Sequence, residues 1–313
     1  MSKLEAVLVT GGAGFIGSHL VEALVAEGYR VRVVDNLATG NLANLAHLEG
    51  RYEWIEGDLA NFETCRRAVE GIDHVLHQAA IPSVPRSVRE PLLSHQSGPT
   101  ATLQILEAAR AAGVRRFLFA ASSSAYGDTE ELPKHEEMLP RPLSPYAAGK
   151  LAGEHYVHVY ARTMGLDGAS LRYFNIFGPR QDPSSPYSGV ISLFIKGMSQ
   201  GQPPTIYGDG LQTRDFTYVA NAVAANLAAL RHPEPLLGRV FNVGTGRRVS
   251  LRELVEALNR ILGTRLEPQY HPPRPGDVRD SLASLARIRQ VLGYEPRVSF
   301  EEGLERTVRS LVA

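Results

Sequence analysis

Short apolar runs alternate with longer mixed segments through the first half of the chain. Residues 6–10 (AVLVT) are apolar and rich in β-branched side chains, which is typical of a strand buried on both faces of a parallel sheet. Similar runs lie at 30–35, 52–59, 73–80 and 116–124. The segments at 11–28 and 99–113 have helical patterns, and each ends on a glycine. This alternation predicts an α/β fold with a doubly wound, Rossmann-type parallel sheet.

The alternation loosens after residue 174. Prolines and glycines become frequent there, as in 178–189 (GPRQDPSSPYSG) and 201–210 (GQPPTIYGDG). We therefore expect a first domain over residues 1–174 and a smaller, mixed substrate domain over 175–313, with some strands and helices interleaved between the two. In a doubly wound sheet, ligands bind beyond the carboxyl ends of the strands.

Three glycines separate the first predicted strand from its helix. Gly11, Gly14 and Gly17 form a G-x-x-G-x-x-G spacing, and their missing side chains let backbone N–H groups approach a pyrophosphate. Asp35 ends the second predicted strand, where its carboxylate can accept both ribose hydroxyls of NAD and would repel the extra phosphate of NADP. Asp58, after the third strand, falls at the height of the adenine. The predicted cofactor is NAD.

Tyr146 stands four residues before Lys150 in a segment with a helical pattern. Residues four apart lie on one face of a helix. A solvent-exposed face is the ordinary interpretation of such a pair, so the pair gains meaning only from the rest of the sequence.

Composition narrows the function classes. The 313 residues contain 33 basic and 33 acidic side chains, so no net charge favours nucleic acid or an anionic membrane. Cys65 is the only cysteine; it excludes an internal disulfide and fits a cytoplasmic location. No stretch is long and apolar enough to be a signal peptide or a membrane span. His155 and His158 have no third ligand at a suitable spacing, so we expect no metal site.

Motifs along nearly the whole chain resemble those of the extended short-chain dehydrogenase/reductase family. Within it the chain is most similar to bacterial nucleotide-sugar 4-epimerases that act on UDP-N-acetylglucosamine or UDP-glucose. The motifs, in order, are TGGAGFIGSHL, DNLATG, GDL, HQAA, SSSAYGD, SPYAAGK, LRYFNIFGPRQDP, TRDFTYV, FNVGTG and RPGDVRDS. The resemblance implies a cofactor site made of Gly11, Gly14, Phe15, Ile16, Gly17, Asp35, Asn36, Asp58, Leu59, Gln78, Ala79, Ala80, Tyr146, Lys150 and Tyr173.

The resemblance also implies catalytic roles. Tyr146 would take a proton from a sugar hydroxyl while hydride leaves the same carbon for NAD. The ammonium of Lys150, with the positive nicotinamide ring, would lower the pKa of Tyr146 toward neutrality. Ser122 falls at the position of the catalytic Ser/Thr that relays the proton, and Ser123 is its rival if the register slips by one residue.

Family members that eliminate water or carbon dioxide carry acidic residues just after the catalytic Ser/Thr. Here those positions are Ser123 and Ser124, so the expected reaction is epimerisation at C4 with NAD regenerated in every turnover. A UDP-glucuronate 4-epimerase is the first alternative, and a decarboxylase or dehydratase is a weaker one. A binding module that holds NAD and UDP-sugar without catalysis is a further alternative, which the retained Ser122, Tyr146 and Lys150 oppose.

The resemblance places the UDP-sugar in the second half. Asn175, Arg214 and Arg274 match positions that hold the diphosphate, and arginine suits this because its planar fork binds phosphate oxygens in pairs. Ser281 falls beside the C2 substituent of the sugar, where a small side chain leaves room for an N-acetyl group. Further expected substrate contacts are Ser83, Arg86, Ser87, Ser123, Ser124 and Asp277.

The sequence departs from the family at Gly98, where an asparagine is usual. Either the loop is shifted in register or an active-site water is held differently. The resemblance further implies a homodimer through helices near 99–112 and 146–163, with no nucleic-acid or membrane partner.

Overall fold

The computed structural model describes residues 4–182, 189–273 and 278–312. In this part of the chain, seven parallel strands form the central sheet, in the order β11-β6-β5-β4-β1-β2-β3. The strands are β1 (Ala6–Thr10), β2 (Arg30–Asp35), β3 (Glu53–Glu56), β4 (His74–His77), β5 (Arg116–Ser122), β6 (Asp167–Tyr173) and β11 (Arg239–Val243). The order reverses between β1 and β4, which is the doubly wound topology that the apolar runs predicted.

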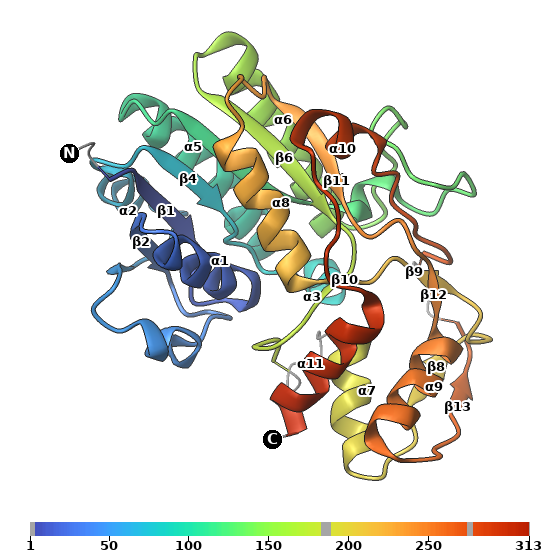
Figure 1. Ribbon diagram of the computed structural model, residues 1–313. Helices are drawn as coiled ribbons and strands as arrows, with labels where there is room; N and C mark the ends of the chain where they lie inside the picture. The colour runs from blue at the N-terminus through green and yellow to red at the C-terminus, as the bar shows by residue number, and fades with distance from the viewer. Residues whose placement is uncertain (1–3, 183–188, 274–277, 313) are drawn as a thin grey trace.

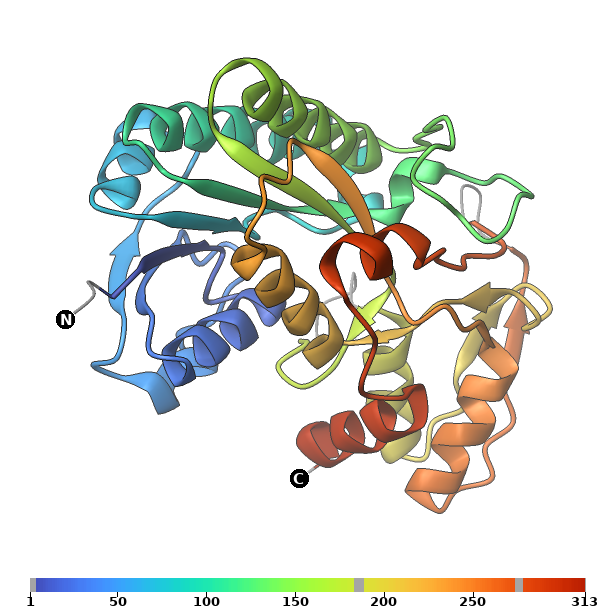
Figure 2. The same cartoon turned by 45° about the horizontal axis from the view of Figure 1, so that its top comes forward.

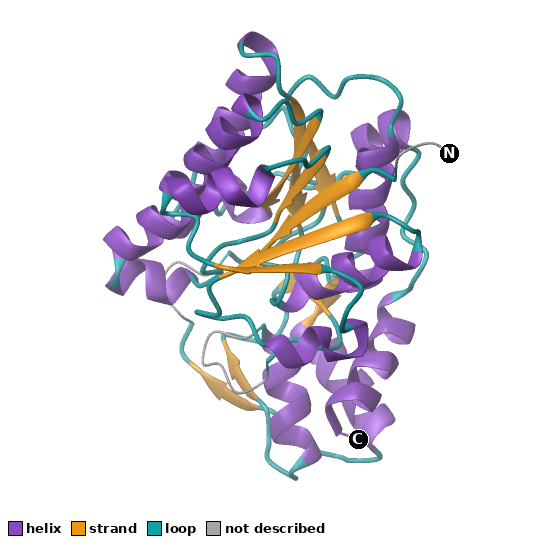
Figure 3. Cartoon of the chain, turned by 90° about the vertical axis from the view of Figure 1, so that its left-hand side faces the viewer, coloured by secondary structure: helices purple, strands orange, loops and turns teal. Residues whose placement is uncertain are grey.

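Helices cover both faces of the central sheet (Figures 1 and 3). One face carries α1 (Phe15–Ala26), α8 (Val219–Arg231) and α10 (Ala286–Leu292); the other carries α2 (Phe62–Val69), α5 (Ala101–Ala111) and α6 (Pro145–Thr163). The two ends of the described chain lie well apart, one at the first strand and the other at the last helix, in the smaller domain (Figure 2).

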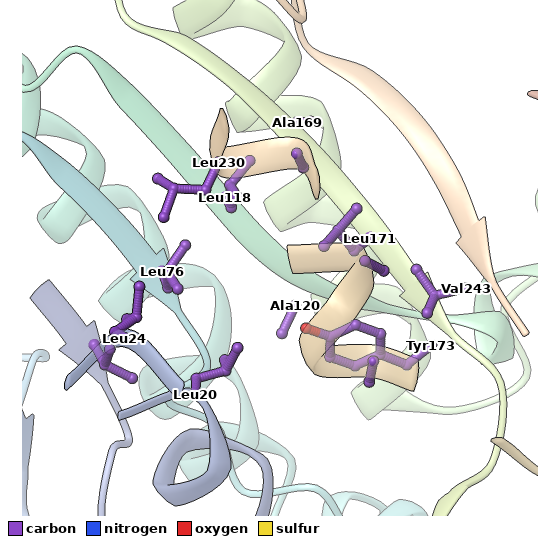
Figure 4. Close-up of a cluster of buried hydrophobic side chains, with 14 of the residues drawn as sticks. Leu20, Leu24, Leu76, Leu118, Ala120, Ala169, Leu171, Tyr173, Leu230 and Val243 are labelled. Carbon is purple, nitrogen blue, oxygen red and sulfur yellow. The ribbon is translucent and has the colours of Figure 1, made fainter. Parts of the chain in front are cut away.

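The strands are buried because their side chains serve two cores. In β1, Val7 and Val9 join the core beneath α1 and α8, while Ala6 and Leu8 join the core beneath α2 and α5, as the alternation of side chains along a strand requires. Figure 4 shows the first core, where leucines of α1 and α8 face the aliphatic side chains of β4, β5 and β6. This two-sided burial explains the continuously apolar strand sequences.

The smaller domain is mixed, as expected. Its described residues form three two-stranded sheets, which pair β7 (Ile176–Phe177) with β10 (Thr217–Tyr218), β8 (Thr205–Tyr207) with β13 (Gln269–His271), and β9 (Thr213–Arg214) with β12 (Val249–Ser250). Around them pack α7 (Val190–Ser199), α9 (Leu251–Leu262) and α11 (Phe300–Val312). Between these elements α8 and β11 return to the central sheet, so the chain crosses between the two halves more than once (Figure 1).

Local capping signals position the site-bearing elements. Ser144 caps α6 by accepting a hydrogen bond from the backbone N–H of Ala147 (3.2 Å), and Pro145 occupies the first turn, where its missing N–H costs nothing. In α9, Ser250 and Glu253 form a reciprocal capping box, and Gly263 ends the helix with φ +68°. The shorter helices are η1 (Leu42–Leu48), α3 (Val84–Arg89), α4 (Pro91–His95), η2 (Gln96–Thr100) and η3 (Ser123–Tyr126).

Among the described ranges, every helix is too short or too polar to cross a membrane.

Candidate active site

A cavity of about 1040 Å³ lies at the carboxyl ends of the central strands. A smaller cavity of about 250 Å³ shares Asn175 and Arg214 with it and extends into the smaller domain. The larger volume is at the upper end of the range for small-molecule sites. The predicted site residues that line it are Gly11, Gly14, Phe15, Ile16, Gly17, Asp35, Asn36, Asp58, Leu59, Gln78, Ala79, Ala80, Ser83, Arg86, Ser122, Ser123, Ser124, Tyr146, Lys150, Tyr173, Asn175, Arg214 and Ser281.

Three predicted residues are not in this set. Arg274 and Asp277 lie outside the described residues. The expectation that Ser87 lines the cavity was wrong. Its side chain is buried at 2% exposure, and its hydroxyl donates to the Val84 carbonyl within α3 (2.7 Å).

In the glycine turn between β1 and α1, backbone segments pack so closely that no side chain fits between them. A Cβ on Gly17 would lie 2.1 Å from the Gly11 carbonyl oxygen, and one on Gly11 would lie 2.8 Å from the Ala79 backbone. Gly11 also has φ +65°, which favours glycine. The turn leads into the N-terminus of α1 at Phe15, so backbone N–H groups and the helix dipole can receive a pyrophosphate. This geometry fits a dinucleotide.

Acidic side chains border the cavity near the carboxyl ends of β2 and β3. The oxygens of Asp35 accept backbone hydrogen bonds from Ala13 (3.0 Å) and Leu37 (2.9 Å). Burial raises the pKa of Asp35, and these hydrogen bonds oppose the rise. Asn36 donates its amide to Asp58 (3.3 Å), which ties the ends of β2 and β3 together. A fixed carboxylate here suits ribose hydroxyls and disfavours a phosphate on them.

Ser122, Tyr146 and Lys150 meet where β5 ends beside the first turns of α6. The Ser122 hydroxyl lies close enough to the Tyr146 phenol to lower its pKa, and it accepts from the backbone N–H and the hydroxyl of Ser124 (3.2 and 2.8 Å). The structure therefore brings Ser122, rather than its rival Ser123, into contact with the phenol. Lys150 is 7% exposed and donates to the Ala120 carbonyl (2.7 Å).

The pKa values differ from the expectation in one respect. Burial raises the pKa of Tyr146, and the Ser122 hydrogen bond only partly opposes it. The expected lowering is therefore absent from the protein by itself, because burial is the larger of the two effects on the phenol. Burial also lowers the pKa of Lys150 to about 8, against the attraction of Glu154. When bound, NAD would supply a hydride acceptor and a positive nicotinamide ring, the remaining source of a lowered Tyr146 pKa.

The substrate end is built from both halves of the chain. Asn175, in a left-handed conformation (φ +39°), donates to the hydroxyl of Ser281 (3.1 Å). Arg214 donates to the backbone carbonyls of Thr213 and Arg279 (2.9 Å each), which anchors its guanidinium beside the cavity. These three side chains come from β9 and from two loops far apart in sequence.

The residues between β4 and α5 make the opposite wall of this end. The Ser83 hydroxyl caps α3 by accepting from the backbone N–H of Arg86 (3.1 Å). The guanidinium of Arg86 pairs with Glu90 (3.1 Å).

The segment around Gly98 forms an irregular helical turn. Residues Gln96–Thr100 form a π-helical turn directly before α5, which inserts one extra residue into the helical path. Ser97 lines the cavity, whereas a Cβ on Gly98 would meet nothing within 4 Å.

Other cavity residues were missed by sequence reasoning. Lys134 lines the substrate end at 1% exposure, and its ammonium donates to the carbonyl and hydroxyl of Thr129. It reaches this place because its backbone pairs with Leu282 and Ser284, next to Ser281. No local pattern marks that pairing. Among the described residues, there is no group of three or more His, Cys, Asp or Glu side chains able to hold a metal ion.

The chain is similar in sequence to known NAD-dependent epimerases. The family model described as "NAD dependent epimerase/dehydratase family" matches residues 7–244. The UDP-glucose 4-epimerase of Mycolicibacterium smegmatis is 40% identical over 305 residues, 96% of each chain.

Two solved structures share the fold over 98% of each chain. The UDP-N-acetylglucosamine 4-epimerase of Methanobrevibacter ruminantium, in complex with UDP-N-acetylmuramic acid, is 37% identical with a TM-score of 0.93. The UDP-glucuronic acid 4-epimerase of Bacillus cereus, in complex with UDP-glucuronic acid and NAD, is 34% identical with a TM-score of 0.91. From its sequence motifs, its doubly wound sheet and these matches, the chain belongs to the NAD-dependent epimerase/dehydratase family of extended short-chain dehydrogenases/reductases, whose cofactor is NAD.

Proposed function

We propose that this protein is a UDP-sugar 4-epimerase that interconverts UDP-N-acetylglucosamine with UDP-N-acetylgalactosamine, and also UDP-glucose with UDP-galactose. The observation that carries the proposal is that Ser122, Tyr146 and the buried Lys150 line the same cavity, where the Ser122 hydroxyl lowers the pKa of the Tyr146 phenol against the effect of burial. Ser123 and Ser124 follow at the positions where an eliminating enzyme would need an acid. Tyr146 can therefore act as the acid/base group at one carbon of the sugar. Positions 123 and 124 supply no second acid that could drive an elimination.

Each of the three residues has a role in this reaction. Tyr146 removes the proton of the C4 hydroxyl through the Ser122 hydroxyl as hydride leaves C4. Lys150, held by the Ala120 carbonyl, places a positive charge one helical turn from the phenol and favours its phenolate form. Return of hydride to the other face of the keto sugar gives the epimer, and Tyr146 then returns the proton.

The nucleotide would be held away from the reacting carbon. Arg214 and Asn175 line both cavities, so a diphosphate between them would leave the uridine in the smaller cavity. An anchored nucleotide lets the keto sugar rotate without leaving the protein, which epimerisation requires. We include Arg274 in this anchor on sequence grounds alone.

The preference for N-acetylated sugars rests on Ser281. Its hydroxyl lies 3.1 Å from the Asn175 amide and lines the cavity, and its small volume leaves room for an N-acetyl group at C2. UDP-glucuronate is a second candidate, since a UDP-glucuronic acid 4-epimerase shares the fold over nearly the whole chain.

The substrate assignment is tested by incubating the purified protein, without added NAD, with UDP-N-acetylglucosamine, UDP-glucose or UDP-glucuronate. The anomeric protons are followed by NMR. We expect the first two sugars to reach equilibrium with their C4 epimers. Conversion of UDP-glucuronate alone would overturn the assignment, and release of a pentose or a 4-keto sugar would overturn the reaction type.

We also infer a homodimer. Val88 in α3, Leu92 in α4, and Tyr156 and Val159 in α6 are exposed apolar side chains on helices that pack side by side. A second copy of the same face would cover them. Light scattering after size exclusion should give twice the chain mass. Leu92→Glu, which introduces a charge at the most exposed of these positions, should give a monomer.

A further inference from the structure

A buried ion pair lies one helical turn beyond Lys150. The side chains of Glu154 in α6 and Arg172 in β6 are each 3% exposed. Arg172 donates Nε to one carboxylate oxygen (2.9 Å) and Nη2 to the other (2.7 Å). Both oxygens of Glu154 accept, which is the geometry of a carboxylate anion facing a guanidinium fork. A fixed negative charge is thereby buried close to the candidate active site.

The spacing along α6 connects this charge to the chemistry. Tyr146, Lys150 and Glu154 follow one another at intervals of four residues, so they lie on one face, each about one turn from the next. Lys150 has little access to water, because its ammonium donates to the Ala120 carbonyl and lies 4.9 Å from the centre of the Phe119 ring. In such surroundings a neighbouring charge acts more strongly than it would in water.

The other titratable groups around Lys150 do not supply that charge. Burial lowers the pKa of His77, in β4, to about 3, so the imidazole is neutral at physiological pH. Burial raises the pKa values of Tyr126, in η3, and Tyr173, in β6, to about 12 each. Among the described residues, Glu154 is the group whose charge raises the pKa of Lys150, and burial lowers it.

Arg172 is itself held in place from two other elements. Its guanidinium lies 4.6 Å from the centre of the Tyr126 ring, and the Tyr126 hydroxyl donates to Asn242 of β11 (2.7 Å). The carboxylate of Glu154 is therefore fixed by η3, β6 and β11 together. A buried ion pair adds little net stability. The contacts that fix the Glu154 carboxylate therefore favour a role for its charge beyond joining α6 to β6.

We propose that Glu154 is a positioning residue for the reaction: its carboxylate, fixed by Arg172, keeps the ammonium of Lys150 protonated inside the protein. This inference rests on the proposed roles of Tyr146 and Lys150 in epimerisation. Glu154 does not touch the reacting atoms; it acts through Lys150, and Lys150 acts on the phenol.

The direct test is a titration of Lys150 itself. The sequence contains only four lysines, Lys3, Lys134, Lys150 and Lys196, so a protein labelled with ¹³C at the lysine ε-carbon gives few NMR signals. Loss of one signal in Lys150→Arg assigns the resonance. In the NAD-loaded protein with Glu154→Gln, we expect the titration midpoint of Lys150 to fall by about one pH unit or more, while Lys196 is unchanged.

A second variant guards against misfolding. Glu154→Gln leaves the Arg172 charge buried without its partner, which is destabilising. The double variant Glu154→Gln/Arg172→Met removes both charges, and we expect its Lys150 midpoint to fall as well. Asp167→Asn is the matched control, because it breaks the ion pair between Asp167 and Arg116 (2.9 Å) at the opposite end of β6, roughly 17 Å along the strand from Arg172.

Activity supplies an independent measurement. The basic limb of the kcat profile should move to lower pH in both Glu154 variants and stay in place in Asp167→Asn. An unchanged Lys150 midpoint in the folded Glu154 variants, or an equal fall in Asp167→Asn, would overturn the proposal. If the wild-type protein epimerises no UDP-sugar, the proposed function fails, and the lysine titration still decides whether Glu154 controls the charge of Lys150.

Discussion

At the scale of single residues, burial sets the chemistry of the site. Lys150 is buried and Tyr146 is partly buried at the cavity wall, and this burial disfavours the charged form of each. The reaction needs a phenolate and an ammonium, so the surroundings must restore both charges. Ser122 contributes a hydrogen bond to the phenol and Glu154 a negative charge to the ammonium.

Removing the phenol hydroxyl tests this assignment of roles. We expect Tyr146→Phe to lower kcat by about 10² to 10⁴-fold, because general acid/base catalysis contributes on this order. The NAD content of the purified variant should match that of the wild type, because the pyrophosphate cradle is untouched. A variant that retained full turnover would show that another group moves the proton.

The pH dependence follows from the pKa of Lys150, which is lowered to about 8. An ammonium is charged below its pKa, so the charge that supports Tyr146 is present at neutral pH and is lost as the pH rises through about 8. We therefore expect kcat to fall on the alkaline side of that value. A kcat that keeps rising well beyond it would show that turnover does not need a charged Lys150.

Sugar selectivity is expected to depend on the volume at Ser281. Ser281→Tyr fills the space beside C2, so we expect it to abolish turnover of UDP-N-acetylglucosamine and to leave UDP-glucose within a few-fold of the wild type. Ser281→Ala is the volume control and should accept both sugars. Competition between the two substrates, followed by NMR, measures the preference. Equal losses of turnover for both sugars in Ser281→Tyr would show that the volume at Ser281 does not set the sugar selectivity.

At the scale of elements, the sequence predicted most of the frame. Apolar runs identified the strands of the first half because both faces of the sheet are covered, and the glycine spacing marked the turn into α1. Lys134 escaped notice because strand-like pairing with residues 282–284 brings it to the site. Glu154 was not singled out from the sequence, since a local pattern cannot reveal the Arg172 partner from β6.

The π-helical turn at Gln96–Thr100 shows the same limit. One extra residue in a helical path changes which side chain faces the cavity, and Ser97 lines it in place of Gly98. Nothing in the hydrophobic spacing distinguishes such a turn from an ordinary helix start. The choice between Ser122 and Ser123 likewise required the position at which β5 ends.

One buried carboxylate links several loop segments of the chain by hydrogen bonds. Asp215 is fully buried and accepts hydrogen bonds from Thr245, Gly246 and Ala283. Asp215→Asn replaces an acceptor by an amide group that cannot accept from all of these donors, so we expect the free energy of unfolding to fall by about 2 to 3 kcal/mol. Urea denaturation measures this, with the exposed Asp209→Asn as the control that should change little.

At the scale of the whole molecule, residues from both halves of the chain line the two cavities. A ligand that spans them binds the folded state alone and stabilises it by mass action. UDP at about one hundred times its Kd should add about 2.7 kcal/mol of stability, seen as a rise in Tm. In Arg214→Ala we expect most of this rise to disappear. A rise of the same size in that variant would show that the diphosphate is held elsewhere.

The central claim is that C4 of the sugar is oxidised transiently and receives its own hydride back. The most direct measurement uses UDP-glucose deuterated at C4, incubated with the purified protein in ordinary water and analysed by NMR and mass spectrometry. We predict that the UDP-galactose formed carries its deuterium at C4, because the hydride never leaves the protein. Loss of the deuterium to water, or its appearance at another carbon, would contradict the account.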